Sequence, residues 1–184
     1  MCNIVIMDRK PYVIFIPYSY PDSNHKMRGV FFKEQAAGLV KSGCDVDVVC
    51  VWAVSFREIF KFTKFIGLSE RKDESGVNVW IYFFPALPQM NIFNLRISNF
   101  ILKRLLKKKM QQRTLPDVLH MHVFSSGKAV REISKEYKIP YIYTEHFSIF
   151  SKTRIHSYIE HSVRDNLTYS ACNTAVGHNL AQFM

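Results

Sequence analysis

Two histidines, His120 and His122, lie two residues apart in the apolar run of the segment DVLHMHVFSSGKAV at 117–130. The run is typical of a buried strand, in which residues two apart point to the same face of the sheet. An imidazole at the end of a strand can donate a hydrogen bond to a sugar hydroxyl or a phosphate, whereas an unpaired buried imidazole costs free energy. We therefore predict that His122, nearer the strand end, lines a ligand cleft. For His120 the favoured alternative is a core histidine bonded to a backbone carbonyl.

A second polar group, Thr144, Glu145 and His146, directly follows the apolar run that begins at Pro140. Ligands of open parallel sheets bind beyond the carboxyl ends of the strands. If the two runs form neighbouring strands, the Glu145 carboxylate and the His146 imidazole reach the same rim as His122. This convergence predicts a binding cleft.

A long polar loop, 18–28, leads into a helix that is expected to begin at Gly29. A glycine at this position lets backbone N–H groups approach an anion, and the helix dipole favours negative charge there, so a phosphate or diphosphate would fit. The segment matches neither the G-x-G-x-x-G pattern nor a P-loop, and we predict neither type of nucleotide site. A simple turn role for Gly29 is the alternative.

The histidines and Glu145 also suit a metal ion, since H-x-H on a strand with a third histidine can bind zinc or manganese. A metal-dependent hydrolase usually needs further carboxylates at strand ends, and the third predicted strand is followed by the segment FFPALPQMN instead. A covalent nucleophile is not indicated either, because no cysteine has a neighbouring base in the sequence and no G-x-S-x-G elbow is present.

The composition is that of an ordinary globular protein, with 184 residues, 48% hydrophobic and 22% charged. The formal net charge of +10 favours anionic partners such as phosphates, nucleic acid or an acidic bilayer. The four cysteines show no C-x-x-C spacing and are expected to be reduced, which suggests the cytosol. No export signal is expected, and no apolar stretch approaches the roughly 18 to 20 residues that span a bilayer.

Short apolar runs alternate with longer helix-like segments, and this alternation is typical of a parallel α/β sheet. Gly43 is expected to close the first helix in a left-handed conformation. The sequence predicts a single α/β domain with a Rossmann-like, doubly wound parallel sheet and helices on both faces. Strands are predicted at 12–17, 45–52, 77–84, 118–123, 140–144 and 171–176, and helices at about 29–42, 92–112, 126–137 and 157–169, with another helix beginning near the last residue.

Three blocks of the sequence resemble the N-terminal domain of the family 4 (group 1) glycosyltransferases, retaining enzymes with two Rossmann-like domains (GT-B type). The blocks are GVFFKEQAAGLVKSGCDVDVVCV at 29–51, LPDVLHMHVFSSGKAVREISKEYKIPYIYTEHFS at 115–148, and NTAVGHNLAQFM at 173–184. They cover most of the chain in the family's order, and the middle block is the most specific. The resemblance implies transfer of a sugar, as in the hexosyltransferase class, from a nucleotide-sugar to an acceptor held largely by this domain.

The same resemblance implies roles for the residues described above. His122 would be the catalytic residue, in contact with the transferred sugar or assisting near the acceptor. The other groups would be Arg28, Gly29 and Val30 near the donor diphosphate, and Glu145, His146 and His120 on the acceptor side.

The family's donor-binding half, with its Glu-x7-Glu motif, has no counterpart in the sequence. We therefore expect residues 1–184 to form the acceptor-side domain, without the donor-binding C-terminal domain, and to transfer little or no sugar alone. Half a cleft can neither exclude water nor clamp a diphosphate. The expected partners are a nucleotide-sugar and a saccharide or lipid-linked saccharide from cell-surface polysaccharide or glycolipid biosynthesis. Neither a tightly bound cofactor nor a metal is expected.

Two segments, 55–68 and 92–113, mix aromatic and basic side chains. In the second, Ile97, Ile101 and Leu105 follow a helical spacing of four, and cationic amphipathic helices can lie on an anionic bilayer, with each Lys or Arg adding about 1 kcal/mol. We expect a cytoplasmic protein that binds peripherally to the inner face of the cell membrane. A helix packed on the sheet with a solvated basic face is the alternative. The candidate membrane-surface residues are Phe56, Arg57, Phe60, Lys61, Lys64, Lys103, Lys107 and Lys108.

A function of another class, a non-enzymatic basic module that binds nucleic acid, also fits the net charge. Such binding would weaken steeply with salt through counterion release. The sequence contains neither zinc-finger spacing nor a ribonucleoprotein-type aromatic motif, so nucleic acid is not an expected partner.

Overall fold

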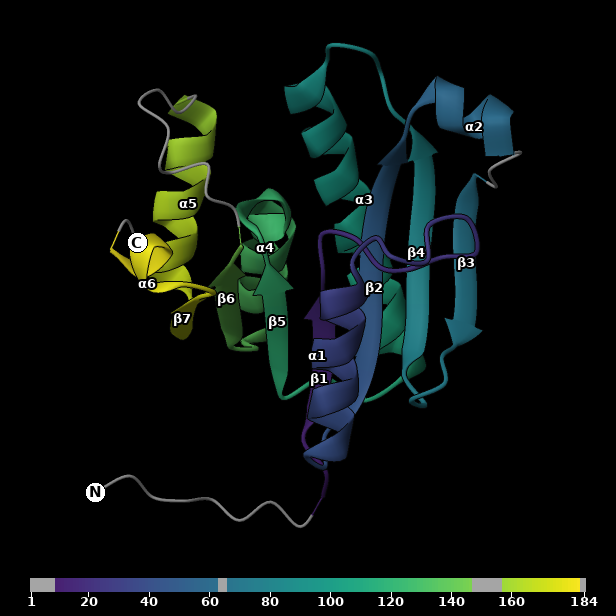
Figure 1. Cartoon of the computed structure of the whole chain (residues 1–184). Helices are drawn as coiled ribbons and strands as arrows, with labels where there is room; N and C mark the ends of the chain where they lie inside the picture. Colours follow the sequence, from purple (N-terminus) through teal and green to yellow (C-terminus); the bar gives the residue numbers. More distant parts are fainter. Residues whose placement is uncertain (1–8, 63–65, 147–156, 183–184) are drawn as a thin grey trace.

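The computed structural model describes residues 9–62, 66–146 and 157–182, which form a seven-stranded sheet with helices on both faces (Figure 1). The Rossmann-like α/β fold predicted from the sequence is confirmed. The strands are β1 (Tyr12–Ile16), β2 (Asp45–Val54), β3 (Gly67–Lys72), β4 (Asn78–Pro85), β5 (Val118–His122), β6 (Tyr141–Glu145) and β7 (Cys172–Ala175). The helices are α1 (Val30–Lys41), α2 (Phe56–Phe62), α3 (Asn91–Gln112), α4 (Gly127–Tyr137), α5 (Ser157–Tyr169) and α6 (His178–Ala181), with a 3-10 turn η1 (Phe124–Ser126).

The order of the strands creates a switch point beside β1. The sheet runs β3-β4-β2-β1-β5-β6-β7, so the chain leaves β1 toward β2 on one side and later returns to β5 on the other. Strands β1, β2, β4, β5, β6 and β7 pair in parallel, and β3 alone among the described strands runs antiparallel, against β4. In such sheets the ligand crevice opens at the carboxyl ends of the strands that flank the switch point. Here those strands are β1 and β5.

Each face of the sheet has its own apolar core. Strand β1 is buried at every position, with Ile14 and Ile16 on one face and Val13 and Phe15 on the other. Helices α3 and α4 cover the first face, and α1 packs on the second (Figure 1). A strand covered on both sides reads as a continuous apolar run, which explains why YVIFI predicts a buried strand so clearly.

The segment 55–68, named above for its aromatic and basic side chains, contains α2 and the first residues of β3, and neither element was among those predicted. Ser55 and Glu58 form a capping box at the start of α2: the Glu58 backbone N–H donates to Ser55 Oγ (3.2 Å), and Ser55 N–H donates to Glu58 Oε2 (3.2 Å). Strand β3 carries the polar sequence GLSERK at the edge of the sheet. Charged residues on an edge strand hinder pairing with other chains, and they also hide the apolar alternation that predicts strands.

Helix α3 packs on the sheet through Leu102, Leu105, Leu106 and Met110, which are all buried. The predicted apolar line along this helix therefore faces the core at Leu105. The outer face of the helix carries Arg96, Phe100, Arg104 and Lys108, which are exposed. The helix therefore packs on the sheet, as the alternative stated, and contact of its basic outer face with a bilayer stays a prediction.

Candidate functional site

A cleft of about 510 Å³ opens at the carboxyl edge of the sheet, beside the switch point. Its walls come from the loop after β1, the end of β2, the start of α3, the η1 turn and the start of α5. Polar and aromatic side chains share the lining. They are Tyr18, Ser19, Arg28, Trp52, Asn91, Asn94, Ser98, Phe124, Ser125, Ser126 and Tyr158.

Among the described residues that line the cleft, Arg28 is the one with a positively charged side chain. Its guanidinium carbon lies 4.2 Å from the centroid of the Trp52 ring, and Nη1 lies 3.6 Å from Glu58 Oε1. The side chain is still 43% exposed, so a ligand in the cleft can reach the guanidinium. Stacking on an indole and pairing with a carboxylate restrict the guanidinium to one orientation.

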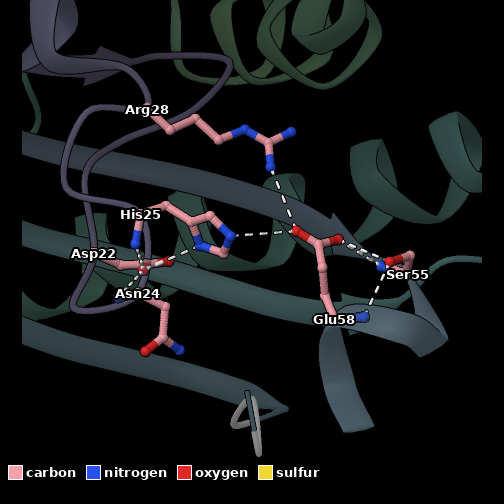
Figure 2. A network of polar contacts seen from close by, with 6 residues as sticks. All are labelled: Asp22, Asn24, His25, Arg28, Ser55 and Glu58. Atoms are coloured by element: carbon pink, nitrogen blue, oxygen red, sulfur yellow. Dashed lines mark hydrogen bonds and ion pairs between the residues drawn. The ribbon is translucent and has the colours of Figure 1, made fainter. Parts of the chain in front are cut away.

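A row of polar groups ties the loop after β1 to α2 (Figure 2). Asp22 Oδ1 accepts hydrogen bonds from Asn24 N–H (2.7 Å) and His25 N–H (2.9 Å), which closes a tight turn. The His25 ring then bridges two carboxylates, with Nδ1 3.4 Å from Asp22 Oδ1 and Nε2 3.5 Å from Glu58 Oε1. This row holds the loop against the start of α2 and thereby fixes the position from which Arg28 projects.

Glu58 ionises readily despite its position in this row. Partial burial opposes the charge, but hydrogen bonds from the Ser55 hydroxyl and backbone, with the charges of Arg28 and His25, hold the pKa of the carboxyl below its usual range. The carboxylate therefore stays charged beside Arg28 at neutral pH.

The backbone conformation just before α1 requires a glycine at position 29. Its φ is 74°, and a Cβ placed there would lie 2.6 Å from the Ser19 carbonyl oxygen. An L-residue would meet both a strained conformation and a collision, so position 29 needs glycine for the turn itself. Val30 is the first residue of α1 and is partly buried. Anion binding at this helix start stays a prediction.

His120 and His122 share a face of β5, as predicted, but their exposure is the reverse of the expected order. His122 is 0% exposed, whereas His120 is partly exposed. The reason is that Phe15 of β1 and Phe32 of α1 pack on His122, with ring centroids 4.2 and 5.2 Å away. His120 Nε2 lies 2.9 Å from Thr144 Oγ1, a side-chain partner in place of the predicted backbone carbonyl.

His122 and His146 are in direct contact, as the convergence of the two strand ends predicts. Nδ1 of His122 lies 2.9 Å from Nε2 of His146. His146 also contacts Phe31 and Phe32, with ring centroids 5.3 and 5.0 Å away. The histidine pair therefore lies beside the first turn of α1, two to three residues beyond Gly29.

All three imidazoles are kept neutral. Burial, with a smaller contribution from His146, lowers the pKa of His120 to about 4. Burial, with contributions from His120 and His146, lowers the pKa of His122 further, and burial lowers the pKa of His146. A neutral imidazole has one N–H donor and one bare nitrogen that accepts, and Nδ1 of His122 and Nε2 of His146 already face each other. The second nitrogen of His146 can therefore bond a hydroxyl, or donate to a phosphate oxygen, without a charge on the ring.

Glu145 does not share the rim with His146. Because side chains alternate along β6, Glu145 is on the same face as Tyr143, opposite the histidines, and it is fully buried. Its Oε2 accepts hydrogen bonds from the Tyr143 hydroxyl and from Phe124 N–H (3.2 Å), and its Oε1 accepts from His146 N–H (2.8 Å). The carboxylate thus ties the η1 turn, on the wall of the cleft, to the end of β6. The residue between β5 and η1, Val123, has a positive φ of 71°, which is strained for a β-branched side chain.

A separate groove of about 620 Å³ on the α1 side of the sheet is lined by His120, Gln35, Thr144 and Thr174, with the fully buried His122 beneath them. His146 does not belong to this lining. The cleft and the groove share no lining residue. Within the described ranges no group of three or more His, Cys, Asp or Glu side chains is arranged to hold a metal ion.

The candidate membrane-surface residues are distributed over two elements. On α2, Phe56, Arg57 and Phe60 are exposed, and Phe60 reaches 83%. The Lys61 side chain and Lys64 lie outside the described residues. On α3 the three candidate lysines each pair with a glutamate: Lys103 with Glu132 (2.6 Å), Lys107 with Glu136 (2.6 Å) and Lys108 with Glu70 (3.8 Å). None of the helices in the described part of the chain has the length and apolar character of a membrane span.

Sequence reasoning missed the partners of Arg28. Trp52 ends the predicted second strand, and Glu58 belongs to the S-x-x-E pattern of a capping box, so both carried a local signal. The serines of the cleft, Ser19, Ser125 and Ser126, carried none, because turn residues of this type are common in loops without function.

Several solved structures share the fold at low sequence identity. A sucrose-phosphate synthase from Thermosynechococcus elongatus matches with a TM-score of 0.62 at 8% identity, over 94% of this chain and 80% of that chain, and a second structure of it matches over 89% and 42%. A putative UDP-N-acetylglucosamine 2-epimerase from Listeria monocytogenes matches with a TM-score of 0.57 at 10% identity, over 95% and 41%. A trehalose-6-phosphate structure from E. coli, bound with UDP-2-fluoro glucose, matches with a TM-score of 0.52 at 8% identity, over 94% and 41%.

The chain thus spans about two fifths of the length of several structures that it matches. No curated protein matches the sequence. The family model of Glycosyltransferase Family 4 matches residues 29–183, which include α1, the switch-point strand β5 and the histidine pair. With this match over most of its length and the fold that the resemblance implied, the chain belongs to glycosyltransferase family 4.

Proposed function

We propose that this chain is the acceptor-side, N-terminal domain of a retaining glycosyltransferase that uses a nucleotide-sugar donor. The observation that carries the proposal is the cleft at the switch point, with an oriented arginine on its wall, beside a neutral histidine pair at the start of α1. Similar structures more than twice as long as the matched region support a second, donor-binding domain in the whole protein.

The donor diphosphate would bind between Arg28 and the start of α1. Arg28 supplies a planar set of N–H donors, and the N-terminal end of a twelve-residue helix supplies a positive partial charge. Gly29 and Val30 provide the backbone that approaches the anion. One similar structure is bound with a UDP-sugar analogue, which supports a nucleotide-sugar as the donor.

The acceptor would bind on the side of the histidines. A sugar hydroxyl can both donate and accept a hydrogen bond, and the partly exposed, neutral His146 offers a ring nitrogen next to the first turn of α1. His120 lies further along the groove, bonded to Thr144, and Glu145 contributes by fixing the strand end. We assign neither a metal nor a tightly bound cofactor to this domain.

The acceptor that we propose is a saccharide or lipid-linked saccharide of cell-surface polysaccharide or glycolipid biosynthesis. Exposed Phe56 and Phe60 on α2, with Arg57, form a cationic and aromatic tip that suits the headgroup region of an anionic bilayer. The paired lysines of α3 add little net charge there, so α2 would make the main contact. This would place the protein in the cytoplasm, at the inner face of the membrane.

The proposal is tested by an assay of sugar transfer. This chain, joined to the donor-binding domain that we expect its gene to encode downstream, is assayed with a panel of labelled nucleotide-sugars and with membrane and saccharide acceptors. Label should pass from one donor to one acceptor class, with the anomeric configuration of the sugar retained. Absence of transfer from every donor to every acceptor, by a folded protein, would overturn the assignment.

A further inference from the structure

His122 cannot reach a ligand directly. Its ring is fully buried between Phe15, Phe32 and His120, whose ring centroids lie 4.2, 5.2 and 4.2 Å away. His146 is only partly buried and lies at the end of β6. Of the two rings in the pair, His146 is the one that a bound molecule can contact.

The two nitrogens in contact share one hydrogen atom. When both rings are neutral, either His122 Nδ1 donates to His146 Nε2, or His146 Nε2 donates to His122 Nδ1, across the same 2.9 Å. In the first arrangement His122 carries its hydrogen on Nδ1, and its Nε2 has a bare lone pair. In the second, His122 carries its hydrogen on Nε2.

The surroundings of His122 Nε2 favour the first arrangement. This atom is buried and has no hydrogen-bond partner among the described residues. Buried N–H groups without an acceptor are rarer in native structures than acceptors without a donor. Placing the hydrogen on Nδ1, where His146 accepts it, avoids an orphan donor among the phenylalanine rings.

We propose that His122 is a positioning residue, which donates its Nδ1–H to His146 Nε2 and so fixes His146 as the Nδ1–H tautomer. His146 then presents a neutral N–H donor to an oxygen of the bound sugar or phosphate. The class of ligand rests on the proposed function, whereas the tautomers of the two rings do not. This assignment exchanges the roles predicted from the sequence, since His146 makes the contact and His122 acts through it.

The tautomers are measured directly by ¹⁵N NMR of the imidazoles in the 184-residue chain. We expect protonated Nδ1 and bare Nε2 on both His122 and His146. A protonated Nε2 on His146 would overturn the inference, whatever the activity of the whole enzyme.

Three substitutions of His122 distinguish a positioning role from a packing role. His122→Asn can keep a polar donor close to the place of Nδ1, whereas His122→Leu cannot, and His122→Phe keeps the ring volume should the leucine variant fail to fold. His146 should stay the Nδ1–H tautomer in the asparagine variant and become a mixture of tautomers in the other two. In the whole enzyme, kcat should fall about tenfold in the leucine or phenylalanine variant with little change in the donor KM, and recover in the asparagine variant.

Three outcomes of these experiments are distinct. Equal kcat in the asparagine and phenylalanine variants, with His146 unchanged in tautomer, would refute positioning by His122. Loss of the tautomer together with kcat would support it. Absence of turnover in the unsubstituted enzyme would refute the proposed function, while the NMR result would still decide the tautomers.

Discussion

The Arg28 guanidinium lies 4.2 Å from the centroid of the Trp52 ring, on the wall of the cleft. The arginine lies in the loop between β1 and α1 and the tryptophan lies near the end of β2, so the contact joins this loop to the strand beside β1. A cation that is oriented before a ligand arrives loses little conformational entropy on binding it.

Replacement of Arg28 by alanine should weaken the binding of an inorganic diphosphate to the chain by about tenfold or more, because a charge-assisted pair of hydrogen bonds is lost. Arg28→Lys should restore only part of the affinity, since lysine keeps the charge but lacks the planar stack on Trp52. Titration calorimetry with pyrophosphate measures both. Arg164→Ala, at an exposed ion pair on α5, is the matched control and should bind like the unsubstituted chain. Equal affinity of all variants for pyrophosphate would show that Arg28 does not bind the diphosphate.

Replacement of Gly29 by alanine should destabilise the fold by about 1 kcal/mol or more, because the positive φ and the approach to the Ser19 carbonyl both exclude a Cβ. Gly38→Ala is the matched control within the same helix, since a Cβ there meets nothing within 4 Å. That substitution should stabilise the protein by about 0.5 to 1 kcal/mol. Urea unfolding of the two variants measures the change in the free energy of unfolding and its sign. A Gly29→Ala variant as stable as the unsubstituted chain would contradict the structure at this turn.

Stability should decrease as the pH falls from about 6.5 to about 4, because the pKa of His120 is lowered to about 4 by burial. In this window the unfolded chain binds a proton at His120 and the folded chain does not, so protonation favours unfolding. Below about pH 4 both states are protonated, and this contribution levels off. Urea unfolding over a pH series should show a loss of up to about 3 kcal/mol from this residue.

His120→Gln should reduce the pH dependence without abolishing it, since His122 and His146 also have lowered pKa values and act in the same direction. His161→Gln, at an exposed position on α5, should leave the pH dependence as it is. Identical pH profiles for the two variants would show that the environment of His120 is not that of the structure.

Phe60→Ser should weaken flotation of the chain with anionic liposomes, because this side chain is 83% exposed at the tip of α2. The free energy of unfolding should change by less than about 0.5 kcal/mol, as is usual for exposed positions. Tyr169→Ser, at an exposed aromatic residue on α5, is the control and should float normally. Flotation unaffected by Phe60→Ser, or a gel shift with RNA in place of flotation, would argue against the membrane-facing role of α2.

The strands around the switch point could be predicted from the sequence because both of their faces are buried. The run at β1 has no charged or strongly polar residue, and the run at β2 has only its two aspartates; the glycine-bounded helix α1 lies between them in the sequence. Strand β5 adds two histidines to an otherwise apolar run. Strand β3 could not be predicted in this way, because an edge strand with the sequence GLSERK has no buried face to produce alternation. Its pairing with β4 depends on the position of β4 in the completed sheet.

The location of the candidate site could be predicted from the sequence, but the arrangement of its side chains could not. That His122 and His146 meet follows from parallel pairing of β5 and β6, but the burial of His122 depends on Phe15 and Phe32, which are distant in the sequence. The position of Glu145 could have been found, because alternation places it with Tyr143 and away from the histidines. The orientation of Arg28 depends on Trp52 and Glu58, and this three-residue contact is formed only in the folded chain.

The buried Glu145 carboxylate binds the backbone of Phe124 on one side and of His146 on the other. A single side chain thereby connects the backbone of the η1 turn, in the wall of the cleft, to the backbone of the residue that carries the His146 ring. A ligand that contacts either would meet backbone already held in its final position, with no rearrangement needed there on binding.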